Sequence, residues 1–222
     1  MTPRPLVIAI DGPSGAGKGT VARTIASRLR YRHVDTGAMY RAVAWKARHE
    51  GIALADAPAV ARIARSAVFS LGGGVVIDGH DVTSDIRTAE IDQAAAVVAR
   101  HPEVRAALVE RQRAYGEGGG VVMEGRDIGT VVFPAADVKV YLDASPDERA
   151  RRRAVDPAHA AGRQRAAVES VAQALEARDL SDRTRAASPL TRASDALYID
   201  TTGVSVEDVV ATVLQRVKGH FL

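Results

Sequence analysis

The sequence predicts an α/β protein with a three-layer α/β/α core, in which helices cover both faces of a five-stranded parallel sheet. Two observations support this fold class. Short apolar runs alternate with segments of helical periodicity along the 222 residues, and this alternation is typical of a parallel sheet connected by helices. A glycine-rich segment also follows the first apolar run and leads into a helical pattern, as in sheets that bind ligands at their strand ends.

Each core element is assigned from its own stretch of sequence. The strands are expected at Leu6–Ile10, Arg32–Val34, Gly120–Met123, Val138–Leu142 and Ala196–Ile199. The helices are expected near 18–29, 38–50, 86–99, 102–115, 146–154, 164–178 and 205–218. Five such strands make a compact sheet, and the whole chain, 1–222, is expected to form a single domain.

Two segments interrupt the core pattern. Ala67–Asp78 holds two β-rich runs around three glycines, which predicts a hairpin. It lies in the longest gap between core strands, so we expect an insertion at about 60–96. A second insertion is expected at about 147–165, where an arginine-rich run is interrupted by Pro157 and Gly162.

The composition excludes several classes of protein. The chain is 46% hydrophobic and 26% charged, which is ordinary for a globular protein with a buried core. It has no cysteine, so disulfides and cysteine-based metal sites are impossible. No apolar run approaches the roughly 18 residues of a membrane helix, and the N-terminal run is too short for a signal peptide. A soluble, cytoplasmic protein is expected.

The glycine-rich segment "DGPSGAGKGT", Asp11–Thr20, predicts a phosphate-binding loop. Glycines allow the backbone to approach a ligand closely, and the following helix directs its N-terminal N–H groups at an anion. Lys18 is in register to reach the β- and γ-phosphates of a nucleotide. The residues expected to contact the nucleotide are Gly12, Pro13, Ser14, Gly15, Ala16, Gly17, Lys18, Gly19 and Thr20.

Further charged clusters follow the predicted strands, where sheets of this type bind ligands. They are "DTGAMYR" with Asp35, Thr36, Tyr40 and Arg41, "EGRDIGTVVFP" with Arg126 and Asp127, and "RDLSDRTR" with Arg178, Asp182, Arg183 and Arg185. Phosphoryl transfer between two nucleotides requires such arginines, because charge on both phosphate groups must be neutralised. A GTPase is disfavoured, since the chain has no Asn-Lys-x-Asp segment.

These strings and their order resemble the bacterial cytidylate kinases. The resemblance runs over essentially the whole chain and is carried by "IDGPSGAGKGT", "DTGAMYR", "IRT", "PEVR", "EGRDIGTVVFP", "KVYLDAS" and "RDLSDRTRAASPL". It implies transfer of the γ-phosphoryl group of ATP to CMP or dCMP, in pyrimidine nucleotide metabolism. It also implies that the insertion at 60–96 binds the monophosphate, that 147–165 forms a short lid, and that 1–59, 97–146 and 166–222 form the core.

The resemblance implies a role for each matching residue. The acceptor nucleotide would be bound by Thr36, Tyr40, Arg41, Arg105, Arg126, Asp127, Arg178, Asp182 and Arg185. Among these, Arg41, Arg126 and Arg185 would hold the acceptor phosphate, Arg105 and Asp127 would read the cytosine edge, and Arg178 and Asp182 would contact the ribose. Lys18, Arg126, Arg149, Arg153 and Arg185 would be catalytic, Arg149 and Arg153 as lid arginines with Arg152 as a further candidate.

Mg²⁺ is expected to arrive with ATP, because the six histidines are scattered and no cluster has the spacing of a built-in metal site. Thr20 is the expected protein ligand, with Asp35 as a possible outer-shell partner, since Mg²⁺ keeps much of its water. The resemblance also suggests a monomer that binds small nucleotides, neither nucleic acid nor a membrane.

One position departs from the family pattern. A serine often stands in the helix before "PEVR", where it helps to bind the cytosine amine, and here the matching residue is Ala96. We expect this chain to prefer CMP over UMP by a smaller margin than family members that carry the serine.

Two alternatives stay open at the level of the sequence. One is a P-loop kinase for another small acceptor, either a different monophosphate or a hydroxyl acid. The other is a basic nucleic-acid-binding protein that uses ATP as a regulatory ligand. That second reading would require aromatic residues interleaved with basic ones, and aromatics make up only 4% of the chain.

Overall fold

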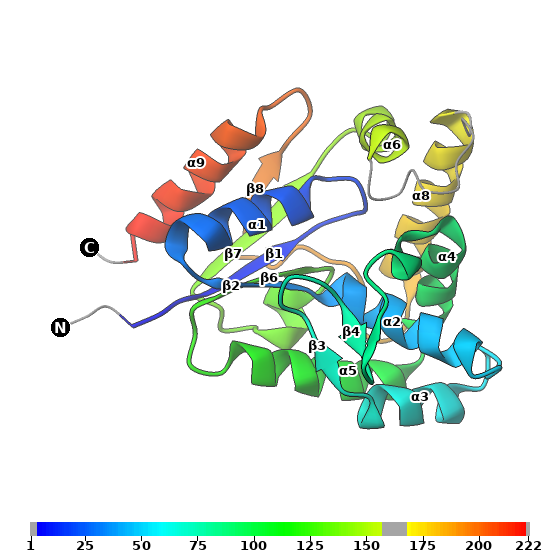
Figure 1. The fold of residues 1–222 in the computed structure, drawn as a ribbon. Coiled ribbons are helices and arrows are strands. Elements are labelled where there is room, and N and C mark those ends of the chain that lie inside the picture. The colour runs from blue at the N-terminus through cyan, green and yellow to red at the C-terminus, as the bar shows by residue number, and fades with distance from the viewer. Residues whose placement is uncertain (1–3, 157–167, 221–222) are drawn as a thin grey trace.

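The computed structural model describes residues 4–156 and 168–220. Its centre is a five-stranded parallel sheet with the strand order β2-β6-β1-β7-β8 (Figure 1). The strands are β1 (Val7–Asp11), β2 (Arg32–Asp35), β6 (Val121–Gly125), β7 (Val138–Asp143) and β8 (Leu197–Asp200). The predicted fold class is therefore confirmed, and each predicted strand lies within two residues of its observed ends.

Helices cover both faces of this sheet (Figure 1). On one face lie α1 (Lys18–Leu29) and α9 (Val206–Lys218), and on the other lies α5 (Pro102–Gly116). Successive residues of β1 point to opposite faces, so Ile8 packs among the residues of α1 and α9. Its neighbour Ala9 packs on the other side, with α5. Because both faces of the sheet are buried at β1, the sequence of this strand is a continuous apolar run.

The chain between β2 and β6 builds a second apolar core. This core is formed by α2 (Thr36–His49), α3 (Ala57–Ser66), α4 (Ala89–Val98), the second face of α5, and a small antiparallel sheet of β3 (Phe69–Ser70), β4 (Val76–Ile77) and β5 (His80–Asp81). The predicted hairpin is confirmed as the pair β3–β4, whereas β5 and α3 were not predicted. Pro58 lies in the first turn of α3, where a missing N–H costs the helix nothing.

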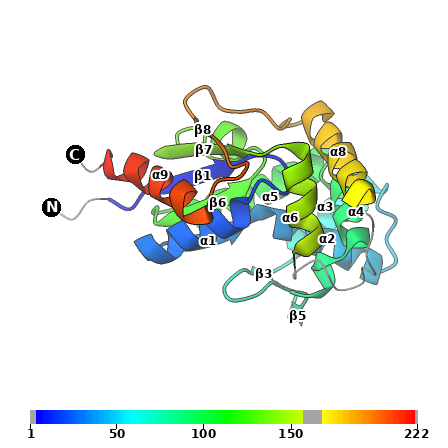
Figure 2. The same ribbon diagram turned by 90° about the horizontal axis from the view of Figure 1, so that it is seen from above.

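Two further helices, α6 (Pro146–Val155) and α8 (Val168–Thr184), lie side by side near α4 (Figure 2). They share a small apolar cluster of their own around Ala150 and Leu175. The predicted start of the second helix, at 164, and the part of the predicted lid at 157–165 lie outside the described residues. Within the described chain, no helix is long and apolar enough to cross a membrane. The division into core, insertion and lid stays a prediction.

Candidate active site

A cavity of about 230 Å³ opens at the carboxyl ends of β1, β2 and β6. The residues that line it follow directly after these strands or face them from α4, α5, α6 and α8. This is the edge at which open α/β sheets bind ligands. The predicted site residues that line the cavity are Ser14, Gly15, Gly17, Lys18, Gly19, Thr20, Thr36, Tyr40, Arg41, Arg105, Arg126, Asp127, Arg153, Arg178, Asp182 and Arg185.

The loop between β1 and α1 has the backbone of an anion site. Gly12, Gly15 and Gly17 have φ angles of 145°, 81° and 87°, a region that side-chain-bearing residues rarely adopt. A Cβ atom on Gly12 would lie 2.0 Å from the Leu142 carbonyl oxygen of β7, so only glycine fits at this position. No side chain caps the N-terminus of α1, which leaves its N–H groups free to bind an anion.

Lys18 is buried at the start of α1 and folds back over the loop. Its Nζ donates a hydrogen bond to the Pro13 carbonyl oxygen at 2.7 Å. Burial, together with the nearby Arg126 guanidinium, lowers the pKa of Lys18 to about 7. The ammonium therefore lies in surroundings that favour an incoming anion, because a phosphate would offset both the burial and the neighbouring positive charge.

A continuous row of ion pairs runs through the cavity from Arg126. Its Nε lies 2.9 Å from Asp182, and Asp182 also pairs with Arg185 at 3.4 Å. Arg185 lies 3.6 Å from Asp127, which is paired in turn with Arg105. All five side chains are mostly buried, so the row is a preorganised array of charge rather than a solvated surface.

The far end of this row is a polar pocket against α2 and α5. The Arg105 guanidinium lies over the Tyr40 ring, 5.4 Å from its centroid, and burial raises the pKa of Tyr40 to about 12. The Tyr40 hydroxyl, Arg105 Nε and Arg185 Nη2 are buried without a hydrogen-bond partner in the described chain. Such groups are expected to bind polar ligand atoms, because buried polar groups are otherwise almost always paired.

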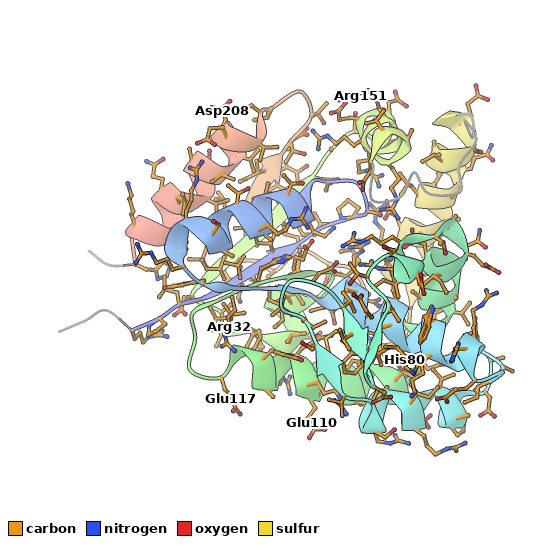
Figure 3. All side chains as sticks on the ribbon, viewed as in Figure 1. Arg32, His80, Glu110, Glu117, Arg151 and Asp208 are labelled. Atoms are coloured by element: carbon orange, nitrogen blue, oxygen red, sulfur yellow. The ribbon has the colours of Figure 1, made fainter. Side chains whose placement is uncertain are left out.

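The predicted lid arginines are placed differently from one another. Arg153 lines the cavity together with Arg152, whereas Arg151 is exposed on the outer side of α6 (Figure 3). Arg149 is buried beneath the loop, where it binds Asp179 and the Ser14 carbonyl oxygen. Arg149 is absent from the residues that line the cavity, as are the loop residues Gly12, Pro13 and Ala16.

Sequence reasoning missed Asp92, which organises two of the cavity arginines. This buried residue of α4 pairs with Arg153 of α6 and, at 3.2 Å, with Arg178 of α8. Its only sequence signal is an acidic residue one turn before Ala96, on the helix that also contributes Ala96 to the cavity. A single carboxylate between two arginines offsets part of their positive charge and holds the two guanidinium groups near each other.

Three side chains that line the cavity carry oxygen atoms, the ligand type that Mg²⁺ prefers. Thr20, Asp35 and Glu124 all line the cavity, and Glu124 Oε1 lies 2.9 Å from His33 Nε2. No group of three or more His, Cys, Asp or Glu side chains that could hold a metal ion occurs in the described residues. Glu124 was missed, although it directly precedes the "GRD" string at the end of β6.

Asp11, at the end of β1, was also missed as a supporting residue. Its carboxylate accepts hydrogen bonds from the N–H groups of Ile128 and Gly129 at 2.8 and 2.7 Å. These residues begin a π-helical turn, Ile128–Val132, directly after Asp127. Burial raises the pKa of Asp11 to about 6. The strand that leads into the phosphate loop therefore also anchors the segment that presents Arg126 and Asp127.

Comparison with known sequences shows which family this chain matches. The profile of the family described as "Cytidylate kinase" matches residues 8–219. A cytidylate kinase of Pelotomaculum thermopropionicum is 50% identical over 95% of this chain and 95% of its own. A cytidylate kinase of Solibacter usitatus is 46% identical over 97% of this chain and 93% of its own.

A solved structure gives the same fold at lower similarity. The shikimate kinase of Acinetobacter baumannii, in complex with shikimate, superposes with a TM-score of 0.51 over 98% of this chain and 96% of its own. Its sequence is 19% identical, so this likeness bears on the fold alone.

Proposed function

The chain belongs to the cytidylate kinase family and transfers a phosphoryl group to CMP or dCMP, and we propose that the cavity beside the loop carries out this transfer with ATP as the donor. One observation supports this assignment above the others. The ion-pair row joins Arg126, which is close to Lys18, to the Arg105–Asp127 pair beneath Tyr40. A phosphate donor and a base-bearing acceptor can therefore be bound at opposite ends of one array.

The residues of the loop would bind ATP. Backbone N–H groups at Gly15, Gly17 and the start of α1 would donate to the phosphates, and Lys18 would bridge the donor and the acceptor. Thr20 would bind Mg²⁺ directly, and Asp35 and Glu124 would do so through water. When bound, Mg²⁺ would neutralise charge on the β- and γ-phosphates.

The remaining cavity residues would bind the acceptor. Arg41, Arg126 and Arg185 would hold its phosphate, and Arg178 and Asp182 its ribose. Asp127 would accept a hydrogen bond from the cytosine amine, while the carbonyl of uracil would leave that carboxylate facing an acceptor. The attacking atom is already an anionic phosphate oxygen, so no general base is required. Positioning and charge stabilisation by Lys18 and the arginines would supply catalysis.

The phosphate of the acceptor is the feature to test first. With Mg-ATP, CMP is expected to be phosphorylated and the nucleoside cytidine to be inert at equal concentration, because cytidine lacks the group that the arginines bind. ADP release in a coupled assay measures both. Comparable turnover with cytidine would contradict a site built around an acceptor phosphate.

ATP binding is expected to take up protons through Lys18. Since its pKa is about 7 in the free protein, Lys18 is mostly neutral at pH 8, and the phosphates favour its charged form. Binding at pH 8 should therefore take up close to one proton per ATP, and ATP affinity should fall as the pH rises above 7. Calorimetry in two buffers of different ionisation enthalpy measures this uptake.

Lys18→Arg is the matched control for proton uptake, because arginine stays charged at this pH and has no proton to gain. Its binding enthalpy should be the same in both buffers. A wild-type enthalpy that does not depend on the buffer at pH 8 would exclude a neutral Lys18 in the free site.

Ala96 is expected to limit discrimination between CMP and UMP. It lines the cavity with Arg105 and Asp127, and its methyl group cannot bind the base amine. Ala96→Ser adds one hydroxyl, which should raise the ratio of kcat/KM for CMP over UMP by about fivefold, the value of one hydrogen bond of about 1 kcal/mol. Initial rates with both acceptors measure the ratio. An unchanged or lower ratio would show that Ala96 does not limit selectivity.

A further inference from the structure

Ser14, at the tip of the phosphate loop, is held on both sides by a buried ion pair. Its N–H donates to Asp179 Oδ1 at 3.3 Å, and its carbonyl oxygen accepts from Arg149 Nη1 at 3.1 Å. Arg149 and Asp179 also bind each other, and the two residues are only 7% and 3% exposed. The four groups close a ring around one residue of the loop.

The partners of Ser14 come from helices far from the loop in sequence. Arg149 belongs to α6 and Asp179 to α8. A Cβ atom on Gly15 would lie 2.9 Å from both the Cβ and the carbonyl oxygen of Arg149, so the backbone of α6 lies directly against the loop. Arg149 Nε also donates to the Ala144 carbonyl oxygen at 3.2 Å, which anchors the guanidinium in this position.

This ring fixes the direction of two functional groups of the loop. A trans peptide places its C=O and N–H on opposite sides. Holding the Ser14 carbonyl against Arg149 therefore turns the Gly15 N–H away from Arg149, and Gly15 lines the cavity. Holding the Ser14 N–H against Asp179 likewise turns the Pro13 carbonyl to the other side, where it accepts from Lys18 Nζ.

We propose that Arg149 and Asp179 are positioning residues that set the loop in its ATP-binding conformation by holding the two peptide groups of Ser14. The proposal rests on the proposed function of the loop, and it replaces the expected role of Arg149 as a catalytic lid arginine. Breaking the pair frees both peptides to rotate, so ATP binding must first reorder them. Recognition of CMP depends on other residues and is affected less.

The test measures the two nucleotides separately in four variants: Asp179→Ala, Asp179→Asn, Arg149→Met and Arg149→Lys. Asp179→Ala and Arg149→Met should raise the Kd for Mg-ATP, measured by calorimetry without acceptor, by about tenfold, as expected for the loss of an ordering hydrogen bond. The Kd for CMP should change less than about threefold. Asp179→Asn keeps an acceptor for the Ser14 N–H and Arg149→Lys keeps the charge, so both should recover part of the affinity.

Val217→Ala provides a control for lost stability alone. Val217 is buried in α9, in the apolar core that α9 shares with α1 and the sheet. Its truncation should lower Tm, and Val217 has no contact with Ser14 among the hydrogen bonds described above. Its Kd for ATP should equal that of the wild type. The double variant Arg149→Met/Asp179→Asn should be little worse than the poorer single variant, since both changes break one ring.

Three results would overturn the proposal: unchanged ATP affinity in folded variants, equal loss of ATP and CMP affinity, or additive losses in the double variant. If Asp179→Ala does not fold, Asp179→Asn and Arg149→Lys still compare the affinities for ATP and CMP, with a smaller expected loss for ATP. Failure of the proposed function is separate, because a wild-type protein that binds ATP without phosphorylating CMP leaves these binding measurements intact.

Discussion

Lys18→Ala is expected to lower kcat for CMP by about a thousandfold, the upper range for removal of one preorganised transition-state donor. Lys18 is buried at the N-terminus of α1, with its Nζ on the Pro13 carbonyl and Arg126 nearby, and bound phosphates would favour its charged form. Among the residues that the structure describes, no other lysine lines the cavity, so another lysine of the loop cannot supply this charge to the transferring group. Single-turnover rates at saturating ATP and CMP measure the loss.

The fold of this variant should stay intact. Burial disfavours the charged form of Lys18, so its removal relieves a desolvation cost rather than breaking an ion pair. Lys139→Ala is the matched control, because Lys139 binds Asp195 and the Pro134 carbonyl outside the cavity. It makes the same change of side chain and should keep the wild-type rate. A folded Lys18→Ala variant with near-wild-type kcat would contradict the catalytic role.

Arg126→Ala is expected to lower kcat/KM for CMP by about a hundredfold to a thousandfold. Arg126 begins the ion-pair row, with its Nε on Asp182, and it is the member of the row close to Lys18. Its guanidinium is therefore placed to bind the acceptor phosphate during transfer. The Kd for ATP should change much less than kcat/KM, because the loop binds ATP without it. Steady-state rates over a range of CMP concentrations measure the effect.

Two further arginine variants make this prediction specific. Arg126→Lys should recover only a small part of the activity, since an ammonium cannot donate the two parallel hydrogen bonds of a guanidinium. Arg192→Ala should behave as the wild type, because Arg192 is exposed and lies over the Tyr198 ring outside the cavity. A kcat/KM for Arg126→Ala within fivefold of the wild-type value would remove Arg126 from the transfer step.

The phosphate loop and the strand-end arginines could be predicted because their chemistry is local in sequence. Glycines at fixed spacing before a lysine have few other uses, and residues directly after parallel strands gather at one edge of the sheet. In the row of ion pairs only Arg126 and Asp127 follow a strand, whereas Arg105 lies in α5 and Asp182 and Arg185 lie at the end of α8. The expectation that the cluster "RDLSDRTR" follows a strand was therefore wrong, although its members were named without knowing their pairing.

The supporting residues could not be predicted, because they act through contacts between distant segments. Asp179 reaches Ser14 across 165 positions and Asp11 reaches Ile128 across 117. Nothing in the local sequence distinguishes these carboxylates from those on a solvated helix face. The same applies to Arg149, which stands in an arginine-rich run and is separated from Arg151–Arg153 only by the way α6 packs on the loop.

The most direct test of the central claim is ADP release with Mg-ATP and a panel of acceptors: CMP, dCMP, UMP, AMP, GMP and shikimate. A site in which Arg105 and Asp127 read the base predicts strong turnover with CMP and dCMP, weaker turnover with UMP, and none with AMP, GMP or shikimate. Turnover that does not depend on the base, or turnover with shikimate in place of CMP, would contradict the account.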